Sequence, residues 1–155
     1  MTSVIAPPNV TIVNDSTLKK DDVAIIPWLI GDEWKKLQKL KVRYIFGHFE
    51  LPHFKMNAMI EMPDQGGLKA NHLSGPEYVF SGHFHKRQNQ GNVWYIGNAF
   101  PHNYADAGDD ERGAMFLEWG GKPEFAPWPD APKYKTLLLS QILDDPDKHL
   151  SPKTY

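Results

Sequence analysis

The sequence predicts an α/β fold that is rich in strands and has few helices. A strand, an amphipathic helix and a second strand follow one another between residues 22 and 48, which is the order of a crossover unit in a partly parallel sheet. Three further apolar segments of strand composition lie between residues 77 and 119. With 155 residues, the chain is long enough for one domain with a core and too short for two ordinary ones.

The first strand is predicted at residues 9–15, "NVTIVND", where an Asn-Asp turn follows the apolar positions. Residues 22–30, "DVAIIPWLI", are apolar on both alternating faces, which is typical of a strand buried on both sides. Pro27 indicates that this strand ends or lies at an edge, because proline has no amide hydrogen to donate. The segment "DEWKKLQKL" at residues 32–40 is predicted to be a helix with Asp32 as its N-cap.

The next strand is predicted at residues 41–48, "KVRYIFGH", and it ends in Gly-His. Residues 53–76 carry Pro, Gly and Asn and show few regular periods, so we expect a long connection there. It should contain one helical turn around "FKMNAMIEM" at residues 54–62. A connection of this length inside a compact domain is usually functional or covers a site.

The later part of the chain is predicted to be mainly strands. We expect strands at residues 77–83, 92–98 and 113–119, and a Gly-Gly hairpin within "WGGKPEF" that leads to another short strand. Residues 1–130 therefore make up the predicted domain. Residues 131–155 are predicted to be a Pro-rich tail with one amphipathic segment near residues 135–143, which docks on another surface.

The composition is that of a soluble globular protein, with 41% hydrophobic and 23% charged residues. The longest apolar run, "VAIIPWLI", is far shorter than the roughly 20 residues that span a bilayer, and the N-terminus lacks the pattern of a secretion signal. The absence of cysteine excludes disulfides and fits a reducing compartment, so we expect a cytoplasmic protein without membrane contact. The net charge of −2 argues against binding nucleic acid through overall charge, but it is compatible with a nuclease whose metals and local basic residues attract DNA.

Three histidines follow the predicted strand ends, in "YIFGH" and "YVFSGHFH". Ligands gather outside the carboxyl ends of parallel strands, so His48, His83 and His85 are candidate metal ligands. In an extended chain, residues i and i+2 point the same way, so His83 and His85 would face the metal while Phe84 turns into the core. Imidazole suits Mn, Fe, Zn, Co or Ni. The alternative is that these are ordinary polar residues at the ends of strands.

Other polar residues near the strand ends are candidate substrate contacts. His102 follows a predicted strand end, and the basic residues Lys86 and Arg87 lie next to the histidine pair. The remaining histidines lie in the long connection or near the C-terminus, where such residues are usually solvated.

The motifs "YIFGHFEL", "YVFSGHFHKRQ", "NVWYIGNAF" and "DERGAMFLEW" resemble the later motifs of calcineurin-like metallophosphoesterases, above all SbcD-type DNA-repair nucleases and related phage recombination endonuclease subunits. The resemblance covers about residues 8–128. It implies a two-sheet αβ sandwich with two divalent metal ions, most often Mn, about 3.5–4 Å apart. By resemblance, His48 and His83 match ligands of one metal, His85 matches a ligand of the other, and Asn98 lies where the family lines its substrate groove.

The chain also departs from this family. The family's earlier motifs, Asp-x-His, Gly-Asp-x-x-Asp and Gly-Asn-His-Asp/Glu, have no match in the sequence, so we assign no catalytic residue. We therefore interpret the chain as the second half of such a domain, a partial sandwich. An edge and a face of its sheet should be exposed.

Three hypotheses follow. The first is part of a metal-dependent phosphodiesterase or nuclease acting on DNA. Its site would be completed by a complementary chain with the missing motifs or by a second copy of this chain. The second is a non-catalytic remnant that serves as a binding or assembly module. The third is a small β-rich domain with incidental histidines. For the first, the coiled-coil ATPase that partners such nucleases is a further expected partner, by analogy.

Overall fold

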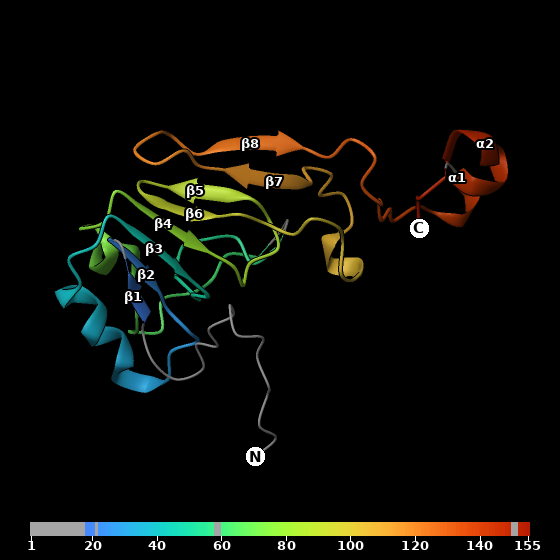
Figure 1. Ribbon diagram of the computed structural model, residues 1–155. Coiled ribbons are helices and arrows are strands. Elements are labelled where there is room, and N and C mark those ends of the chain that lie inside the picture. The colour runs from blue at the N-terminus through green and yellow to red at the C-terminus, as the bar shows by residue number, and fades with distance from the viewer. Residues whose placement is uncertain (1–17, 21, 58–59, 150–151) are drawn as a thin grey trace, which may run out of the picture.

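The computed structural model describes residues 18–20, 22–57, 60–149 and 152–155. The strand predicted at residues 9–15 lies outside this part of the chain. Within it, the fold is mixed α/β, with two sheets and short helices, as the sequence predicts (Figure 1).

The larger sheet has six strands among the described residues, in the order β1-β2-β3-β4-β6-β5. Strands β2, β3, β4 and β6 are parallel to their neighbours in this series, and β1 and β5 are antiparallel edge strands. This confirms the partly parallel sheet. The bounds are Leu18–Lys20 (β1), Val23–Ile25 (β2), Tyr44–Gly47 (β3), Tyr78–Ser81 (β4), Gln88–Gln90 (β5) and Val93–Tyr95 (β6).

One face of the larger sheet forms the hydrophobic core. The parallel register aligns Ala24, Ile45, Val79 and Val93 in a single row across four strands. Each of these side chains is at most 1% exposed. Leu37 and other side chains from the helix and loops on this side complete the same core cluster. The period-2 apolar pattern of the strands thus decides which face is buried.

The helix between β2 and β3 is a 3₁₀ helix, η1, at Gly31–Lys39. Its N-cap is Ile30, so the prediction of Asp32 as the N-cap is wrong. Glu33 takes the capping role instead, because its carboxylate accepts a hydrogen bond of 2.9 Å from the Ile30 amide. Asp32 lies inside the first turn, where it pairs with Lys35 at 2.6 Å.

The long connection after β3 contains no helical turn among its described residues near position 55, so that prediction is wrong. Lys55 and Glu61 instead form an antiparallel bridge. Next to this bridge, the Asn57 side chain accepts a hydrogen bond of 3.0 Å from the Ile60 amide. A short 3₁₀ helix, η2 at Ala70–Leu73, follows.

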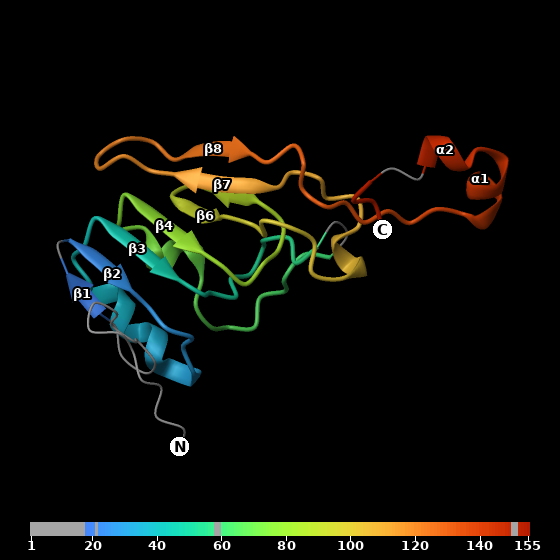
Figure 2. The ribbon, with the colours of Figure 1, turned by 45° about the vertical axis from the view of Figure 1, so that its right-hand side comes forward.

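The second sheet is a hairpin of β7 (Gly113–Phe116) and β8 (Glu124–Pro127), as the Gly-Gly turn predicts. Figures 1 and 2 show it across the face of the larger sheet that is opposite to η1. Its turn is fixed to the sheet because the Gly120 amide donates a hydrogen bond of 2.8 Å to the Tyr44 hydroxyl.

The hairpin covers this second face incompletely. Ile25 remains 45% exposed and Phe46 remains 40% exposed, although both lie in strands of the larger sheet. Between the hairpin and the sheet is an open cleft of about 400 Å³. Apolar side chains from both sheets line it, including Phe46, Phe80, Ile96, Met115 and Leu117. Tyr44 and Phe80 on the same face are only 1% and 5% exposed. The face is therefore partly exposed, and its link to the missing family motifs stays a prediction.

Beyond the hairpin, two short helices, α1 (Leu139–Asp144) and α2 (Pro146–His149), have no buried residues. The amphipathic segment predicted near residues 135–143 thus becomes helical only from Leu139. Leu138, Leu139 and Leu143 are exposed, and Ile142 is half-buried. In the described part of the chain, no helix is long and apolar enough to cross a membrane.

Candidate metal centre

The parallel pairing of β3 and β4 brings two of the candidate ligands together. Gly47 at the end of β3 pairs with Ser81 at the end of β4, and a histidine follows shortly after each strand. The rings of His48 and His83 are 5.2 Å apart between centroids and almost perpendicular, at 88°. Both histidines therefore lie at one edge of the sheet, as the strand-end argument predicts.

Gly82 makes room for this histidine pair. A Cβ atom at Gly82 would lie 2.7 Å from Nδ1 of His48, a separation that packed atoms do not adopt. The Gly82 amide also donates a hydrogen bond of 3.1 Å to the Gly47 carbonyl, which holds the two strand ends together. The absence of a side chain at position 82 thus allows the His48 ring to lie against the β4 end.

The backbone at His83 differs from the expected extended conformation. His83 has φ of 76°, in the left-handed region, so the i, i+2 argument for His83 and His85 is wrong. Phe84 is nevertheless buried, at 4% exposure, as predicted. The left-handed turn sends the His83 ring toward His48 and toward Trp28, whose ring centroid is 5.2 Å away.

The electrostatic surroundings of His83 favour its neutral form. Burial is the largest cause and lowers the pKa of His83, and the nearby His48 and His85 lower it further. Glu50 acts in the opposite direction, with its carboxylate 3.9 Å from Nε2 of His83. A neutral imidazole retains the lone pair that a metal ion needs.

His85 belongs to a second group of side chains. Its Nδ1 lies 2.9 and 3.2 Å from the two carboxylate oxygens of Asp106. The ring of His102 is 5.1 Å away between centroids. Asp106 is the last residue of the 3₁₀ helix η3, Tyr104–Asp106, and it is only 5% exposed.

Hydrogen bonds keep the Asp106 carboxylate ionised. Burial alone would raise the pKa of Asp106, but hydrogen bonds from the His102 amide and the His85 ring together outweigh burial, and the pKa lies below its usual value. The His102 amide donates to this carboxylate at 2.7 Å. The ionised carboxylate therefore has a partner on each side.

The predicted substrate contacts have clear partners in the structure. Lys86 lies 3.8 Å from the carboxylate of Asp109. Arg87 donates to Glu111 at 2.7 Å and its guanidinium lies over the Phe125 ring, 4.0 Å from the centroid. These contacts tie the two basic residues to the loop and hairpin. Their contact with substrate stays a prediction.

Asn98 is placed beside the second group of side chains. The backbone amide of Asn98 donates a hydrogen bond of 3.0 Å to the His85 carbonyl. Its side-chain Nδ2 is buried and has no hydrogen-bond partner among the described residues. A buried amide of this kind leaves a donor for a ligand or water at this position.

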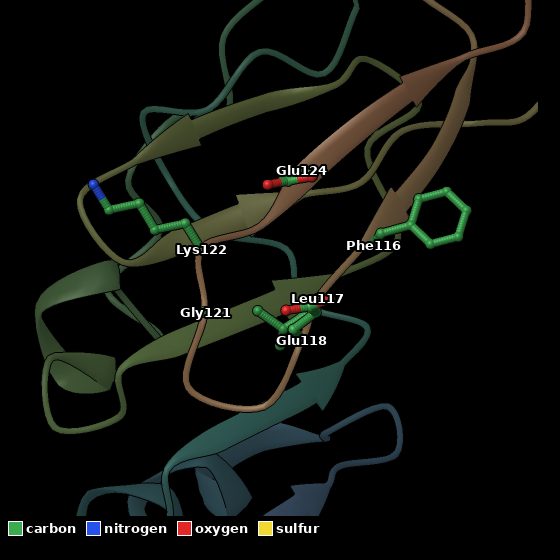
Figure 3. Close-up of a pocket in the computed structure, with 6 residues that line it drawn as sticks. All are labelled: Phe116, Leu117, Glu118, Gly121, Lys122 and Glu124. Carbon is green, nitrogen blue, oxygen red and sulfur yellow. The ribbon is translucent and has the colours of Figure 1, made fainter.

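Two hollows on the surface differ in whether a histidine lines them. One, of about 270 Å³, adjoins the histidine pair and is lined by Trp28, Trp34, His48 and Glu50 among others. The other, of about 420 Å³, is formed by the β7–β8 hairpin and holds Glu118, Lys122 and Glu124 (Figure 3). None of the histidines lines the hollow of Figure 3, so the first of the two is the one that fits a site.

The candidate ligands carry nitrogen and oxygen donors of the kinds that divalent metal ions bind. His48 and His83 could hold one ion, with Glu50 next to them, and His85 offers its Nε2. Within the residues that the structure describes, however, no three His, Cys, Asp or Glu side chains form a group that could hold a metal ion. Further ligands would have to come from elsewhere.

Sequence reasoning missed Asp106, Glu50 and Trp28. Asp106 is one of several acidic residues between positions 106 and 111, and no spacing distinguishes it from Asp109 or Asp110. Glu50 was within reach of prediction, since it follows His48 by two residues in the motif "GHFE".

Comparison with known proteins shows a similarity to a phage protein. No protein-family profile matches the chain. Exonuclease subunit 1 of Enterobacteria phage T4 is 28% identical to it over 127 residues, which cover 77% of this chain. The chain spans 37% of the length of that relative. The similarity indicates a relationship to nucleases.

Proposed function

We propose that this chain is part of a metal-dependent phosphodiesterase that acts on DNA, with a binuclear site that another polypeptide segment completes. The observation that carries the proposal is the pairing of His48 and His83 at the ends of two parallel strands, with His85 held nearby by a buried carboxylate. The similarity to a phage exonuclease subunit supports the same class of reaction and suggests DNA as the substrate.

In this proposal, each histidine supplies one imidazole nitrogen to a divalent metal. The proposed metal is Mn²⁺, with Fe, Zn, Co or Ni as alternatives. A bound pair of such ions supplies a hydroxide nucleophile and neutralises charge on the phosphodiester. The chain's own residues hold and orient these ligands. Lys86 and Arg87 lie beside the site and could attract the phosphate backbone, and Asn98 and His102 lie next to His85.

The missing ligands would come from a complementary chain or from a second copy of this chain. Three imidazoles without a bridging carboxylate hold two divalent ions poorly, because hard or borderline ions prefer oxygen ligands in the bridge. The partly uncovered face with Ile25 and Phe46, and the open cleft beneath the hairpin, provide apolar surface for such a segment. The family resemblance also suggests a coiled-coil ATPase as a further partner.

A specific observation favours a second candidate, a non-catalytic binding or assembly module. The described residues contain no group of three side chains that could hold a metal ion, and Lys86 and Arg87 are engaged in ion pairs within the chain. A remnant of a nuclease domain would keep the strands and their apolar face while losing the reaction.

The two candidates differ in a cleavage assay. Mn²⁺-dependent hydrolysis of a simple phosphodiester and of DNA is measured with this chain alone and with a polypeptide that carries the missing Asp-x-His, Gly-Asp-x-x-Asp and Gly-Asn-His motifs. We expect activity only in the mixture, and we expect His83→Asn to abolish it. His53→Asn is the matched control, because His53 also has a left-handed φ, of 67°, and lies in the long connection after β3. Absence of cleavage in the mixture, together with absence of Mn²⁺ binding, would favour the module.

A further inference from the structure

We propose that Asp106 is a positioning residue, which fixes the His85 imidazole in the tautomer that presents Nε2 to a metal ion. The inference rests on the proposed function for the metal, but the tautomer itself is a property of this chain alone. The observation is a buried carboxylate within hydrogen-bond distance of Nδ1 of His85.

The hydrogen bond decides which ring nitrogen carries the proton. An ionised carboxylate can only accept hydrogen bonds, so Nδ1 of His85 must be the donor. In the neutral ring, Nε2 then holds the free lone pair. A free histidine prefers the opposite tautomer only slightly, so one charge-assisted hydrogen bond is enough to reverse the preference.

Asp106 is itself held rigidly enough to act in this way. Its Oδ2 accepts hydrogen bonds from the His102 amide at 2.7 Å and from the Asn103 amide at 3.4 Å. The side chain is 4% exposed, so water competes little for these bonds. The carboxylate therefore has a fixed place and a fixed charge with respect to the His85 ring.

The backbone of His85 is fixed from the other side by Arg112. This arginine is 2% exposed, and its Nη1 donates to the His85 carbonyl at 3.3 Å. Its Nη2 lies 3.5 Å from the Asp106 carbonyl and 3.6 Å from the Asp109 carboxylate. Arg112 thus joins the backbone of His85 to that of Asp106. The loop from residue 103 to residue 112 holds both ends of the interaction.

Metal-bound histidines commonly donate their second ring nitrogen to a carboxylate, which sets both the orientation and the basicity of the ring. The side chain of His85 is 34% exposed, so Nε2 can remain accessible while Nδ1 is bonded to the buried Asp106. By contrast, no carboxylate lies within hydrogen-bond distance of His48 among the described residues. The positioning effect should therefore be specific to His85.

The first experiment needs no metal and no variant. Nitrogen-15 NMR of the full chain, labelled at the imidazole nitrogens, identifies the tautomer of each histidine; the spectra are recorded near pH 8, above the ordinary imidazole pKa of about 6.5. We expect His85 to carry its proton on Nδ1. Observation of the Nε2-protonated tautomer at His85 would overturn the inference, whatever the chain does with metals.

The second experiment uses Asp106→Asn, with Asp110→Asn as the matched control. Asp110 lies in the same loop, but its side chain is 48% exposed and its nearest cation, Lys133, is 3.7 Å away. An asparagine at position 106 can donate to Nδ1 as well as accept from it, so the tautomer preference of His85 should weaken. The control variant should keep the tautomer of the original chain.

Mn²⁺ then provides an independent readout through paramagnetic broadening of the imidazole signals. We expect Asp106→Asn to raise the Mn²⁺ concentration that broadens His85 by about ten-fold or more, the usual scale for loss of such a partner. Broadening of His48 and His83 should change much less. A variant that leaves both the tautomer and the broadening of His85 unchanged would overturn the positioning role.

The outcomes separate this inference from the proposed function. In one outcome, His85 is protonated at Nδ1 and its tautomer changes in Asp106→Asn, but Mn²⁺ broadens none of the imidazole signals. This result would support control of the tautomer by Asp106 and refute the metal site. Mn²⁺ binding to all three histidines with no effect of Asp106→Asn would refute the positioning role and retain the metal site.

Discussion

The imidazole of His48 lies directly against Gly82, so close that a methyl group at position 82 would come within 2.7 Å of Nδ1. The ends of β3 and β4, at Gly47 and Ser81, are 34 residues apart in the chain and pack against each other at this point. The approach depends on the smallest residue at one position, and it brings the His48 ring within 5.2 Å of the His83 ring.

Gly82→Ala should separate these two rings. The exposed His48 side chain can rotate away from the new methyl group, so the free energy of unfolding should change by no more than about 0.5 kcal/mol. The nuclear Overhauser contact between the two imidazoles should be lost, and Mn²⁺ should broaden them at higher concentration. Gly75→Ala is the control, because nothing lies within 4 Å of its added Cβ. An intact ring contact in Gly82→Ala would contradict the role of this glycine.

The lowered pKa of His83 predicts a pH dependence of stability. As the pH falls below the unfolded-state pKa of about 6.5, the unfolded chain binds a proton at this position before the folded chain does. The free energy of unfolding should therefore decrease with falling pH in this window and level off below the folded pKa of His83. Chemical denaturation at a series of pH values measures the slope.

The matched pair His83→Asn and His53→Asn separates protonation from backbone strain. Both histidines have a left-handed φ, and asparagine tolerates that conformation. The slope should flatten in His83→Asn and remain in His53→Asn, whose native side chain is 66% exposed. An equal slope in all three proteins would show that His83 does not carry the effect.

Arg112→Met should destabilise the chain strongly. The substitution leaves the nearly buried Asp109 carboxylate without its guanidinium partner and removes donors from the His85 and Asp106 carbonyls. Breaking a buried charge pair from one side costs about 3–5 kcal/mol. Thermal or chemical unfolding measures the loss.

Lys133→Met provides the comparison for Arg112→Met. Lys133 pairs with Asp110 at 3.7 Å, but both side chains are more than 40% exposed. Exposed pairs contribute about 0–1 kcal/mol. If the two variants were equally stable, the buried contacts of Arg112 with Asp109 and the His85 and Asp106 carbonyls would not contribute the expected stability.

Tyr95→Phe should destabilise the core below the candidate site. The fully buried hydroxyl of Tyr95 donates to the Phe49 carbonyl at 2.8 Å and accepts from the Leu51 amide at 3.1 Å. Removing it leaves both backbone groups without this partner, at a cost of about 1–3 kcal/mol. Burial also raises the pKa of Tyr95, so its phenol should ionise only when alkali unfolds the chain. Early ionisation in the folded chain, detected by absorbance, would contradict this burial.

Much of the fold could be predicted because the strands carry their own signals. Alternating apolar residues identify the strands at Tyr44–Gly47, Tyr78–Ser81 and Val93–Tyr95, and the Gly-Gly turn identifies the hairpin. The short polar strand Gln88–Gln90 was missed, since its pairing with β6 lies in backbone hydrogen bonds that polar side chains do not reveal. The helical turn expected near residue 55 was wrong, because Lys55 and Glu61 pair as an antiparallel bridge and the Asn57 side chain accepts from the Ile60 amide.

For the candidate site, local sequence patterns were enough to predict that the imidazoles follow strand ends, because a Gly-His step after an apolar run marks a strand end. Which side chains meet depends on how the strands and loops pack. His48 pairs with His83 because β3 and β4 are neighbours in the sheet, and His85 turns to Asp106 because a left-handed residue at position 83 breaks the extended path. Contacts between residues far apart in the chain depend on strand order and loop paths, and no local pattern of residue types encodes them.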